Sequence, residues 1–511
     1  SVVLLCSGFA LYSFFRLSAA EGQKDFNLYE LVPSTTSAVF VTDDVLEFVA
    51  EVDELTCSKN QQYLYVSKLF SYLKQSLYAL SEDTPHGLSR QMNQMLISFH
   101  EPDNERNQVL YCRLGNGDKE LVNRFVRKYI SSLYPPKTFI YKGEEIIIYP
   151  MADGDFLACY LTSDFMALSF QKKLIENVID AYKSGKSLAD DSTFTGIRAP
   201  KKSAAAATIY TRMQGMMGWT EFDMKMKDDF IYFSGITHDA DTCFAFINQL
   251  RQQQSVKGFP GEVLPSTAFY FSRQGITDWV SLLSYGNAQG QSVPARTSEV
   301  QNRDKEFSRY LMENAGQDLV ACLFQREDTL QDAAAVLSLS VADVTEAERM
   351  LRALVNAASA DEGRRNPRIT FCYTVNKAYL IYRLPQTTLF EQLTSFAEPT
   401  LDVYAAFYGG RLLLAPDADA LAHYIRQLDK GEVLNGAMAY QTGMDHLSDS
   451  YHFMLMADFD HIFQQSENHV RFVPDFFLRN ADFFRHFTLF VQFACADGVV
   501  YPNIVLKYKS E

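Results

Sequence analysis

The sequence predicts an α+β protein built from two tandem divergent repeats, each a mostly antiparallel sheet with packed helices, after an N-terminal membrane segment. Short alternating apolar runs are joined by turns of a few residues, which is typical of antiparallel strands. Helical patterns separate these runs at irregular intervals. The stretch ELVPSTTSAVFVTD at 30–43 is echoed by EVLPSTAFYFSRQ at 262–274, which indicates that one folding unit occurs twice.

The first residues predict a membrane-targeting segment over 1–20. Residues 1–15 carry no charge and fall short of the ~20 residues that span a bilayer. Because the sequence does not begin with Met, we expect this segment to be truncated at its start. A cleaved signal peptide would place Ser18 and Ala20 before the cut, whereas Arg16 lies where a cleavage region is normally uncharged. The charge of Arg16 in this region favours an uncleaved signal anchor over a cleaved signal peptide.

The remaining chain divides into a first α+β repeat over 21–257 and a second over 258–511, with the boundary near RQQQSVKGFPG at 251–261. In each half the echoed opening leads into a strand and then a helical pattern, at 44–55 and at 275–285. The two halves therefore begin with the same succession of elements.

A strand, a polar turn, a strand and a helix follow in each half, and then a tight hairpin whose second strand ends at proline. Two more strands, a helix that ends at glycine and a closing hairpin complete the pattern. The matched stretches are 94–133 with 318–358, 138–150 with 369–385, 155–185 with 402–431, and 219–237 with 485–508. Turn signals occur at Lys142-Gly143, Asn376-Lys377 and Asp497-Gly498.

Two facing halves predict a groove between them, which is where a ligand is first expected. The polar stretch GNAQGQSVPARTSE at 286–299 has no counterpart in the first half and predicts a long loop.

The composition excludes some classes of function. The chain has 62 acidic and 47 basic residues and a formal net charge of −15. A groove that neutralises phosphates would have to form against this field, so nucleic acid is not an expected partner. The eight cysteines contain no C-x-x-C pair, which excludes the usual zinc-ribbon and thioredoxin spacings. Cys112, Cys159 and Cys372 lie in apolar runs and are expected to be buried free thiols.

No known catalytic motif occurs. KSGKSL at 183–188 has Asp180 where a phosphate-binding loop needs its first glycine, and no G-x-S-x-G or H-E-x-x-H is present. Asp417 is placed to cap a helix rather than to bind calcium. Catalytic residues are thus unknown, and no cofactor and no metal ligand are predicted.

Histidines concentrate late in the chain without the short spacings of a metal site. His452 lies in SYHFMLMADFD, where Tyr451, Phe453 and Leu455 are expected on one face of a strand buried on both sides. Asp458 or Asp460 is expected to cap the helix that begins near His461. The six late histidines are His423, His446, His452, His461, His469 and His486.

An apolar N-terminal segment followed by LYELVPSTTSAVFVTDD at 28–44 resembles uncharacterised membrane-anchored envelope proteins of Bacteroidales, a domain-of-unknown-function family. The resemblance implies an inner-membrane anchor with the bulk of the chain in the periplasm of a bacterial envelope. It implies no catalytic residue, because the family has no established activity.

Two functions follow as hypotheses. The first is a non-catalytic, membrane-tethered envelope protein that binds a protein or an amphiphilic ligand through its paired repeats, in the groove or at an exposed sheet edge. Its expected partners are an envelope protein or a lipid. The alternative is an enzyme of unrecognised class, such as a hydrolase, that uses histidines and carboxylates of the second repeat.

Overall fold

In the computed structural model, the chain forms two compact units. Unit 1 comprises residues 1–51 and 65–214, and unit 2 comprises residues 52–64 and 215–511. The structure describes residues 26–59, 92–101, 104, 106–115, 118–125, 134–151, 154–197, 205–212, 218–237, 245–283, 297–326, 333–361, 369–375, 377–394, 400–465 and 473–509. The predicted membrane segment at 1–20 lies outside these residues.

Among its described residues, unit 1 has eight strands in one antiparallel succession, β8-β1-β2-β3-β7-β6-β5-β4. Its elements are η1 (Leu28–Leu31), β1 (Ala38–Thr42), β2 (Met95–Phe99), β3 (Gln108–Arg113), α5 (Asp118–Phe125), β4 (Lys137–Tyr141), β5 (Glu144–Pro150), β6 (Phe156–Leu161), β7 (Phe165–Ser169), α6 (Lys172–Ser184), α7 (Ser192–Ile197) and β8 (Ala207–Thr211). Helix α2 (Val45–Glu54) crosses the division between the units.

In the part of unit 2 that the structure describes, twelve strands form the antiparallel succession β9-β10-β22-β21-β20-β12-β13-β14-β18-β17-β16-β15. Its strands are β9 (Thr220–Lys227), β10 (Phe230–Thr237), β12 (Ala268–Gly275), β13 (Ala315–Gln325), β14 (Ala333–Val341), β15 (Ile369–Tyr373), β16 (Ala378–Arg383), β17 (Tyr404–Tyr408), β18 (Arg411–Ala415), β20 (Phe453–Asp458), β21 (Phe487–Ala496) and β22 (Val499–Tyr508). Two short strands, β11 (Val256–Lys257) and β19 (Ser450–Tyr451), pair separately.

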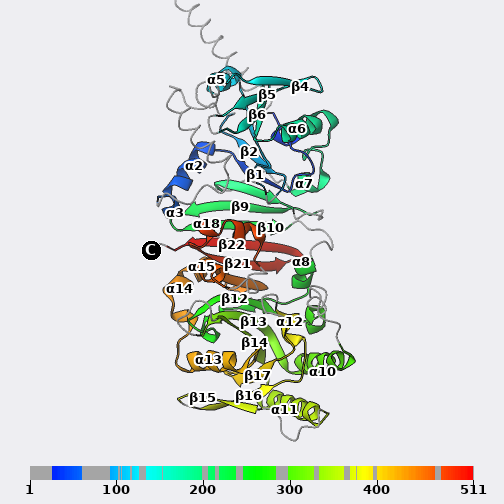
Figure 1. Ribbon diagram of the computed structural model, residues 1–511, viewed down its shortest axis with the longest axis vertical. Coiled ribbons are helices and arrows are strands. Elements are labelled where there is room, and N and C mark those ends of the chain that lie inside the picture. The colour runs from blue at the N-terminus through cyan, green and yellow to red at the C-terminus, as the bar shows by residue number, and fades with distance from the viewer. Residues whose placement is uncertain are drawn as a thin grey trace, which may run out of the picture. The chain divides into compact units, whose positions relative to one another are not determined.

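Helices cover both faces of the unit 2 sheet, and Figure 1 shows them on the strands β12 to β18. The helices are α3 (Thr56–Lys59), α8 (Ala245–Arg251), η3 (Pro260–Val263), α10 (Ser298–Asn314), α11 (Val344–Asp361), α12 (Leu389–Leu393), α13 (Ala418–Asp429), η4 (Leu434–Gly436), α14 (Met438–Met444), α15 (Phe459–Phe463), α17 (Asp475–Arg479) and α18 (Ala481–Phe484). One apolar core lies between the sheet and α10 to α12, and a second lies between the sheet and α13 with α14. A strand covered on both faces is apolar on both, which explains the near-continuous apolar sequence of β13 and β14.

The two echoed Pro-Ser segments make matching backbone hydrogen bonds, each within its own unit. In unit 1, Ser34 N donates to Lys186 O at 3.2 Å, and Leu188 N donates to Val32 O at 2.8 Å. In unit 2, Ser266 N donates to Glu432 O at 2.8 Å, and Leu434 N donates to Leu264 O at 2.9 Å. Each segment therefore closes onto the residues that follow a helix, α6 or α13.

Several local predictions are confirmed. Asp417 caps α13 by accepting a hydrogen bond from Ala420 N at 2.7 Å. Gly185 and Gly431 take the left-handed backbone conformation after α6 and α13, with φ of 63° and 76°, which glycine adopts without a Cβ penalty. The sheets are antiparallel throughout the described pairings, as the short connections predicted.

The closing hairpin of the first half lies in unit 2. Strand β10 pairs with β22 from Phe230↔Lys507 to Thr237↔Val500, so β9 and β10 extend the sheet of the second half. The compact units consequently divide after Gln214, and this division does not coincide with the repeat boundary predicted after residue 257.

Helix α10 was not foreseen from the sequence, and the loop predicted at 286–299 ends inside it. Thr297 caps the helix by accepting from Val300 N at 3.3 Å. The predicted loop residues 286–296 lie outside the described part of the chain. None of the helices in that described part combines the length and the apolar character needed to cross a membrane.

Candidate functional site

Strand β15 ends the strand succession of unit 2 and is the candidate site. Its sequence ITFCY is rich in β-branched and aromatic residues and contains no charge and no proline, which favours a strand. The strand pairs with β16 in the register Thr370↔Ile381, Phe371↔Leu380 and Cys372↔Tyr379. Among the strands that the structure describes, β16 is its one partner.

The hydrogen-bonding direction of β15 follows from the adjoining turn. Thr374 N donates to Lys377 O at 2.9 Å, so this pair is hydrogen-bonded across the hairpin. Hydrogen-bonded and non-hydrogen-bonded pairs alternate in an antiparallel ladder. The backbone N–H and C=O groups of Ile369, Phe371 and Tyr373 are therefore directed away from β16, along the outer edge.

Two of these three residues also expose their aromatic side chains. Phe371 is 53% exposed and Tyr373 is 69% exposed, and their rings stack with centroids 6.2 Å apart. Val375 in the turn is 91% exposed. The edge thus combines outward backbone groups with exposed apolar side chains.

Cys372, between the two aromatic residues, holds the strand against helix α13. Its side chain is 1% exposed, and its Sγ donates to Ala422 O at 3.7 Å. Burial raises the pKa of the thiol, so Cys372 is a small apolar anchor, as the sequence predicted. This contact packs one face of β15 against α13.

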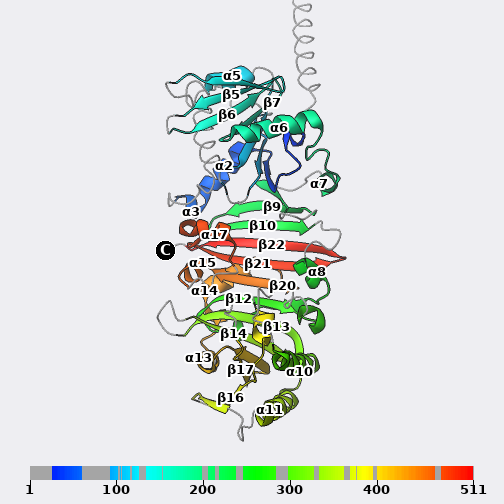
Figure 2. The ribbon, with the colours of Figure 1, turned by 45° about the vertical axis from the view of Figure 1, so that its right-hand side comes forward.

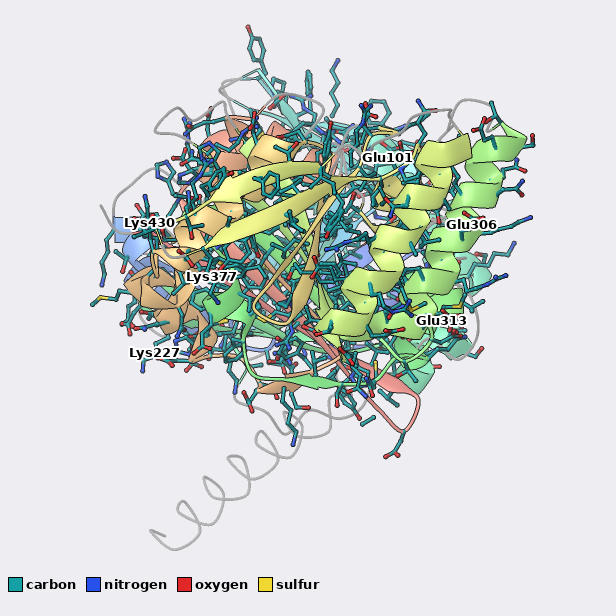
Figure 3. The ribbon with its side chains drawn as sticks, turned by 90° about the horizontal axis from the view of Figure 1, so that it is seen from below. Glu101, Lys227, Glu306, Glu313, Lys377 and Lys430 are labelled. Atoms are coloured by element: carbon teal, nitrogen blue, oxygen red, sulfur yellow. The ribbon has the colours of Figure 1, made fainter. Side chains whose placement is uncertain are left out.

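The charges near this edge lie beside the strand and not on it. Figure 3 looks onto this end of unit 2 and labels Lys377 at the hairpin turn and Lys430 after α13, whereas Glu306 and Glu313 lie on α10. Lys430 is paired with Glu432 at 3.9 Å.

The last strand of unit 1, β4, differs because it carries a charge of its own. Its sequence KTFIY begins with Lys137, and the ammonium group of Lys172 in α6 also lies 5.1 Å from the ring centroid of Phe139. Charges on an edge strand oppose unwanted pairing with other chains. Strand β15 has no charge of its own, so it lacks this protection.

The described late histidines occupy separate elements. Asp458 caps α15 by accepting from the backbone N–H groups of Asp460 and His461, at 3.1 and 3.4 Å, as predicted. His446 contacts the rings of Phe230 and Tyr232. His469 lies outside the described residues. Among the residues that the structure does describe, no group of three or more His, Cys, Asp or Glu side chains is arranged to hold a metal ion.

The prediction for the strand around His452 was wrong in one respect. Tyr451 packs in the same core as Met454 and Met456, not on a face with Phe453. The reason is an interruption at His452, where β19 ends and β20 begins and the alternation of faces restarts. His452 Nδ1 accepts a hydrogen bond from Cys495 N at 3.1 Å, and burial lowers the pKa of the ring.

A serine–histidine contact occurs in unit 1 that the sequence did not indicate. Ser98 Oγ lies 2.9 Å from His100 Nε2 and 3.0 Å from the hydroxyl of Tyr111. Ser98 and Tyr111 are both 0% exposed, and burial lowers the pKa of His100 to about 4. A nucleophilic serine has to reach substrate, so this contact is a hydrogen-bonded core group.

Comparison with known proteins adds no further information about this site. No protein-family model matches the sequence, and searches of curated proteins and of solved structures return no match.

Proposed function

We propose that this protein is a non-catalytic component of a bacterial cell envelope that binds an extended segment of a partner protein along the edge of β15. The uncharged residues 1–15 support an inner-membrane tether, with the bulk of the chain in the periplasm. The exposed edge of β15 is the observation that carries the binding function.

The chemistry of this edge defines the partner. Outward N–H and C=O groups at Ile369, Phe371 and Tyr373 match the backbone of another extended strand, which is how peptides add to sheet edges. Because Phe371 and Tyr373 project from the same face, the partner strand should carry apolar side chains at alternate positions on that face.

The expected affinity is modest. An added strand of this length forms only a few backbone hydrogen bonds, each worth about 0.5–1.5 kcal/mol net. Interfaces of this small size are usually transient. We expect a dissociation constant on the order of 10 μM for an isolated peptide.

We also infer that the two halves arose by duplication. The strand succession β8-β1-β2-β3-β7-β6-β5-β4 of unit 1 has the same order along the chain as β20-β12-β13-β14-β18-β17-β16-β15 of unit 2. The matching hydrogen bonds of Ser34 and Ser266 support the same inference. Under this correspondence β4 and β15 are the same strand of two repeats, and only the second is without charge.

A peptide-display selection against the purified full-length protein tests the function. Wild-type protein is expected to enrich peptides with alternating apolar residues, and fluorescence anisotropy then gives their dissociation constants. Replacing Phe371 by Lys places a charge on the outer face of β15 and should weaken binding at least tenfold.

Thr370→Lys is the matched control. Thr370 is exposed on the same strand, but its side chain lies on the opposite face and its backbone faces β16. This variant should bind the selected peptides as wild type does. Equal loss of binding in both variants, or no enrichment of extended apolar peptides, would contradict edge binding.

A further inference from the structure

Strand β15 itself has the properties that the proposed function assigns to its partner strand. A strand that adds to the outer edge of β15 has to be extended and apolar at alternate positions. β15 carries Ile369, Phe371 and Tyr373 at alternate positions, and the backbone groups of the same three residues point outward. A second copy of this chain therefore offers a matching strand.

One antiparallel register uses all three residues at once. When Phe371 lies opposite Phe371 of a second copy, Ile369 lies opposite the second copy's Tyr373, and Tyr373 lies opposite its Ile369. Opposite residues whose backbone groups both point into the new ladder form hydrogen-bonded pairs, each of which exchanges two bonds. These pairs give about six backbone hydrogen bonds, related by a twofold axis at Phe371. Other antiparallel registers that bring outward residues opposite each other form fewer such pairs within the strand.

The absence of charge from β15 favours a second copy over an unrelated strand. Across a twofold axis a residue meets itself or a close neighbour in its own sequence, so a charge at the axis faces a like charge, which is destabilising. The sequence ITFCY has no charged residue. Lys377 lies in the adjoining turn, and its two copies would be roughly 40 Å apart because each is about six positions from the axis.

The helices on the two faces of the sheet are anchored on strands inside this edge. On one face, the hydroxyl of Tyr382 in β16 donates to Glu348 of α11 at 2.7 Å and accepts from Arg352 at 3.0 Å. On the other face, α13 packs across the strands from β14 to β18. In Figure 2, α11 lies beside β16 and α13 beside β17. Beyond these helices, Phe371 and Tyr373 keep 53% and 69% of their surface exposed.

We propose that the β15 strands of two copies of this protein pair with each other, antiparallel, across a twofold axis at Phe371. The inference rests on the proposed function, because it names the partner that binds the edge of β15. The pairing joins the sheets of two copies of unit 2 edge to edge. One pair of short strands is a small interface, so the dimer is transient and depends on protein concentration. Its dissociation constant is expected to be on the order of 10 μM.

Sedimentation velocity of the purified full-length protein in detergent, from about 1 to about 200 μM, tests the proposal across the expected dissociation constant. The wild-type protein should change from monomer to dimer over this range. Phe371→Lys and Phe371→Glu each place like charges opposite each other at the axis and should weaken the dimer at least tenfold. Phe371 is half exposed, so both variants should fold.

The two charge variants are each other's matched control. In an equimolar mixture, the lysine of one copy lies opposite the glutamate of the other, and opposite charges across a ladder attract. The mixture should therefore recover the dimer that neither variant forms alone. Native mass spectrometry with one variant isotope-labelled should identify the recovered species as a heterodimer.

Disulfide crosslinking tests the register. A mixture of Ile369→Cys and Tyr373→Cys should form a linked dimer on oxidation with diamide, because Cα atoms of a hydrogen-bonded pair are about 5.5 Å apart, which a disulfide spans. Either variant alone should stay unlinked, since its two cysteines would be roughly 14 Å apart. The native Cys372 is buried and its pKa is raised by burial, so it should not compete.

Three results would overturn the self-pairing. The first is a wild-type monomer at every concentration, the second a dimer that persists in Phe371→Lys and Phe371→Glu measured separately, and the third a mixture of these variants that stays monomeric. A monomeric wild-type protein that still binds the selected peptides leaves the proposed function intact and excludes only the second copy as partner. A monomer that binds no selected peptide contradicts both.

Discussion

Ser234 of β10 and Asn503 of β22 lie opposite each other in the antiparallel ladder that joins a strand from the middle of the chain to its last strand. The hairpin β9–β10 turns at Asp228, so Lys227 and Phe230 form the first hydrogen-bonded pair next to the turn. From there, hydrogen-bonded and non-hydrogen-bonded pairs alternate along the ladder. Ser234 consequently directs its backbone groups to β9, and Ser234 with Asn503 is a non-hydrogen-bonded pair.

This pair should accept a disulfide. Cα atoms of such pairs are about 4.5 Å apart, within the range that a disulfide spans. We expect Ser234→Cys with Asn503→Cys to form an intramolecular bond on mild oxidation, detected as a linked peptide by mass spectrometry. Buried native thiols such as Cys322, whose pKa is raised by burial, should not compete. The diagonal pair of Ser234→Cys with Tyr501→Cys is the control, and its linkage in preference to the first pair would contradict the register.

Asp318 contributes to stability through two guanidinium groups. Arg273 Nε donates to its carboxylate at 3.0 Å, and Arg411 Nη2 at 3.3 Å. Burial alone would raise the pKa of Asp318, but the two arginines and a hydrogen bond from Ser340 hold it below its ordinary value. Asp318→Asn should lower the free energy of unfolding of unit 2 by about 3 kcal/mol at pH 7, because it leaves buried arginine charge unpaired.

The pH dependence gives the sign of this contribution. A carboxyl group whose pKa is depressed in the folded state stabilises that state at every pH above its unfolded-state pKa, which is about 3.9 for Asp. The stabilisation is lost as the pH falls through the pKa of the folded state. The difference between Asp318→Asn and wild type should therefore be constant from pH 7 to 5 and shrink below pH 4. Urea unfolding followed by tryptophan fluorescence measures it, because Trp219 and Trp279, the two tryptophans of the chain, both lie in unit 2. Asp419→Asn, at an exposed position, should change stability by less than about 0.5 kcal/mol.

His100 should make unit 1 sensitive to mild acid. Its pKa is lowered to about 4 by burial, so the neutral ring is favoured in the folded state. The stability that depends on the neutral ring is present above pH 6.5 and is lost as the pH falls toward 4. At pH 5 the loss should be roughly 2 kcal/mol, from 1.36 kcal/mol for each pKa unit. Hydrogen exchange of peptides from β2 and β3 should show this loss of stability at pH 5 in the wild-type protein. The same loss in His100→Gln would contradict its assignment to His100.

Proline substitutions distinguish the two edges of β15. Phe371 directs its N–H outward, so Phe371→Pro should destabilise unit 2 little beyond the loss of the side chain seen in Phe371→Ala. Thr370 directs its N–H to β16, so Thr370→Pro should cost about 3 kcal/mol. Urea unfolding by tryptophan fluorescence compares the three variants, and equal costs for the two prolines would show that the ladder alternates differently.

Local features of the fold could be predicted from the sequence because they depend on neighbouring residues. Asp417 and Asp458 cap their helices, and Gly185 ends α6, as side-chain chemistry and backbone preference require. The polar helix α10 has its buried residues Val300, Asp304, Phe307 and Leu311 at helical spacing, but charged residues within that face hid the pattern.

Features that depend on distant pairing could not be predicted. The sequence of β10 is compatible with the last strand of a first domain, and its pairing with β22 depends on residues about half the chain away. For the same reason, ITFCY predicts a strand but does not indicate that β15 is an edge, since that depends on which strands remain unpaired.

The ladder between β10 and β22 constrains how the chain can be completed during synthesis. Residues 220–237 emerge from the ribosome long before Val499–Tyr508, the strand that pairs with them. Until then β10 remains an open edge carrying Ile231 and Phe233, which is a hazard for association with other nascent chains. Export in an unfolded state, or a chaperone that covers this hairpin, would keep the first half from aggregating while it waits for the last strand.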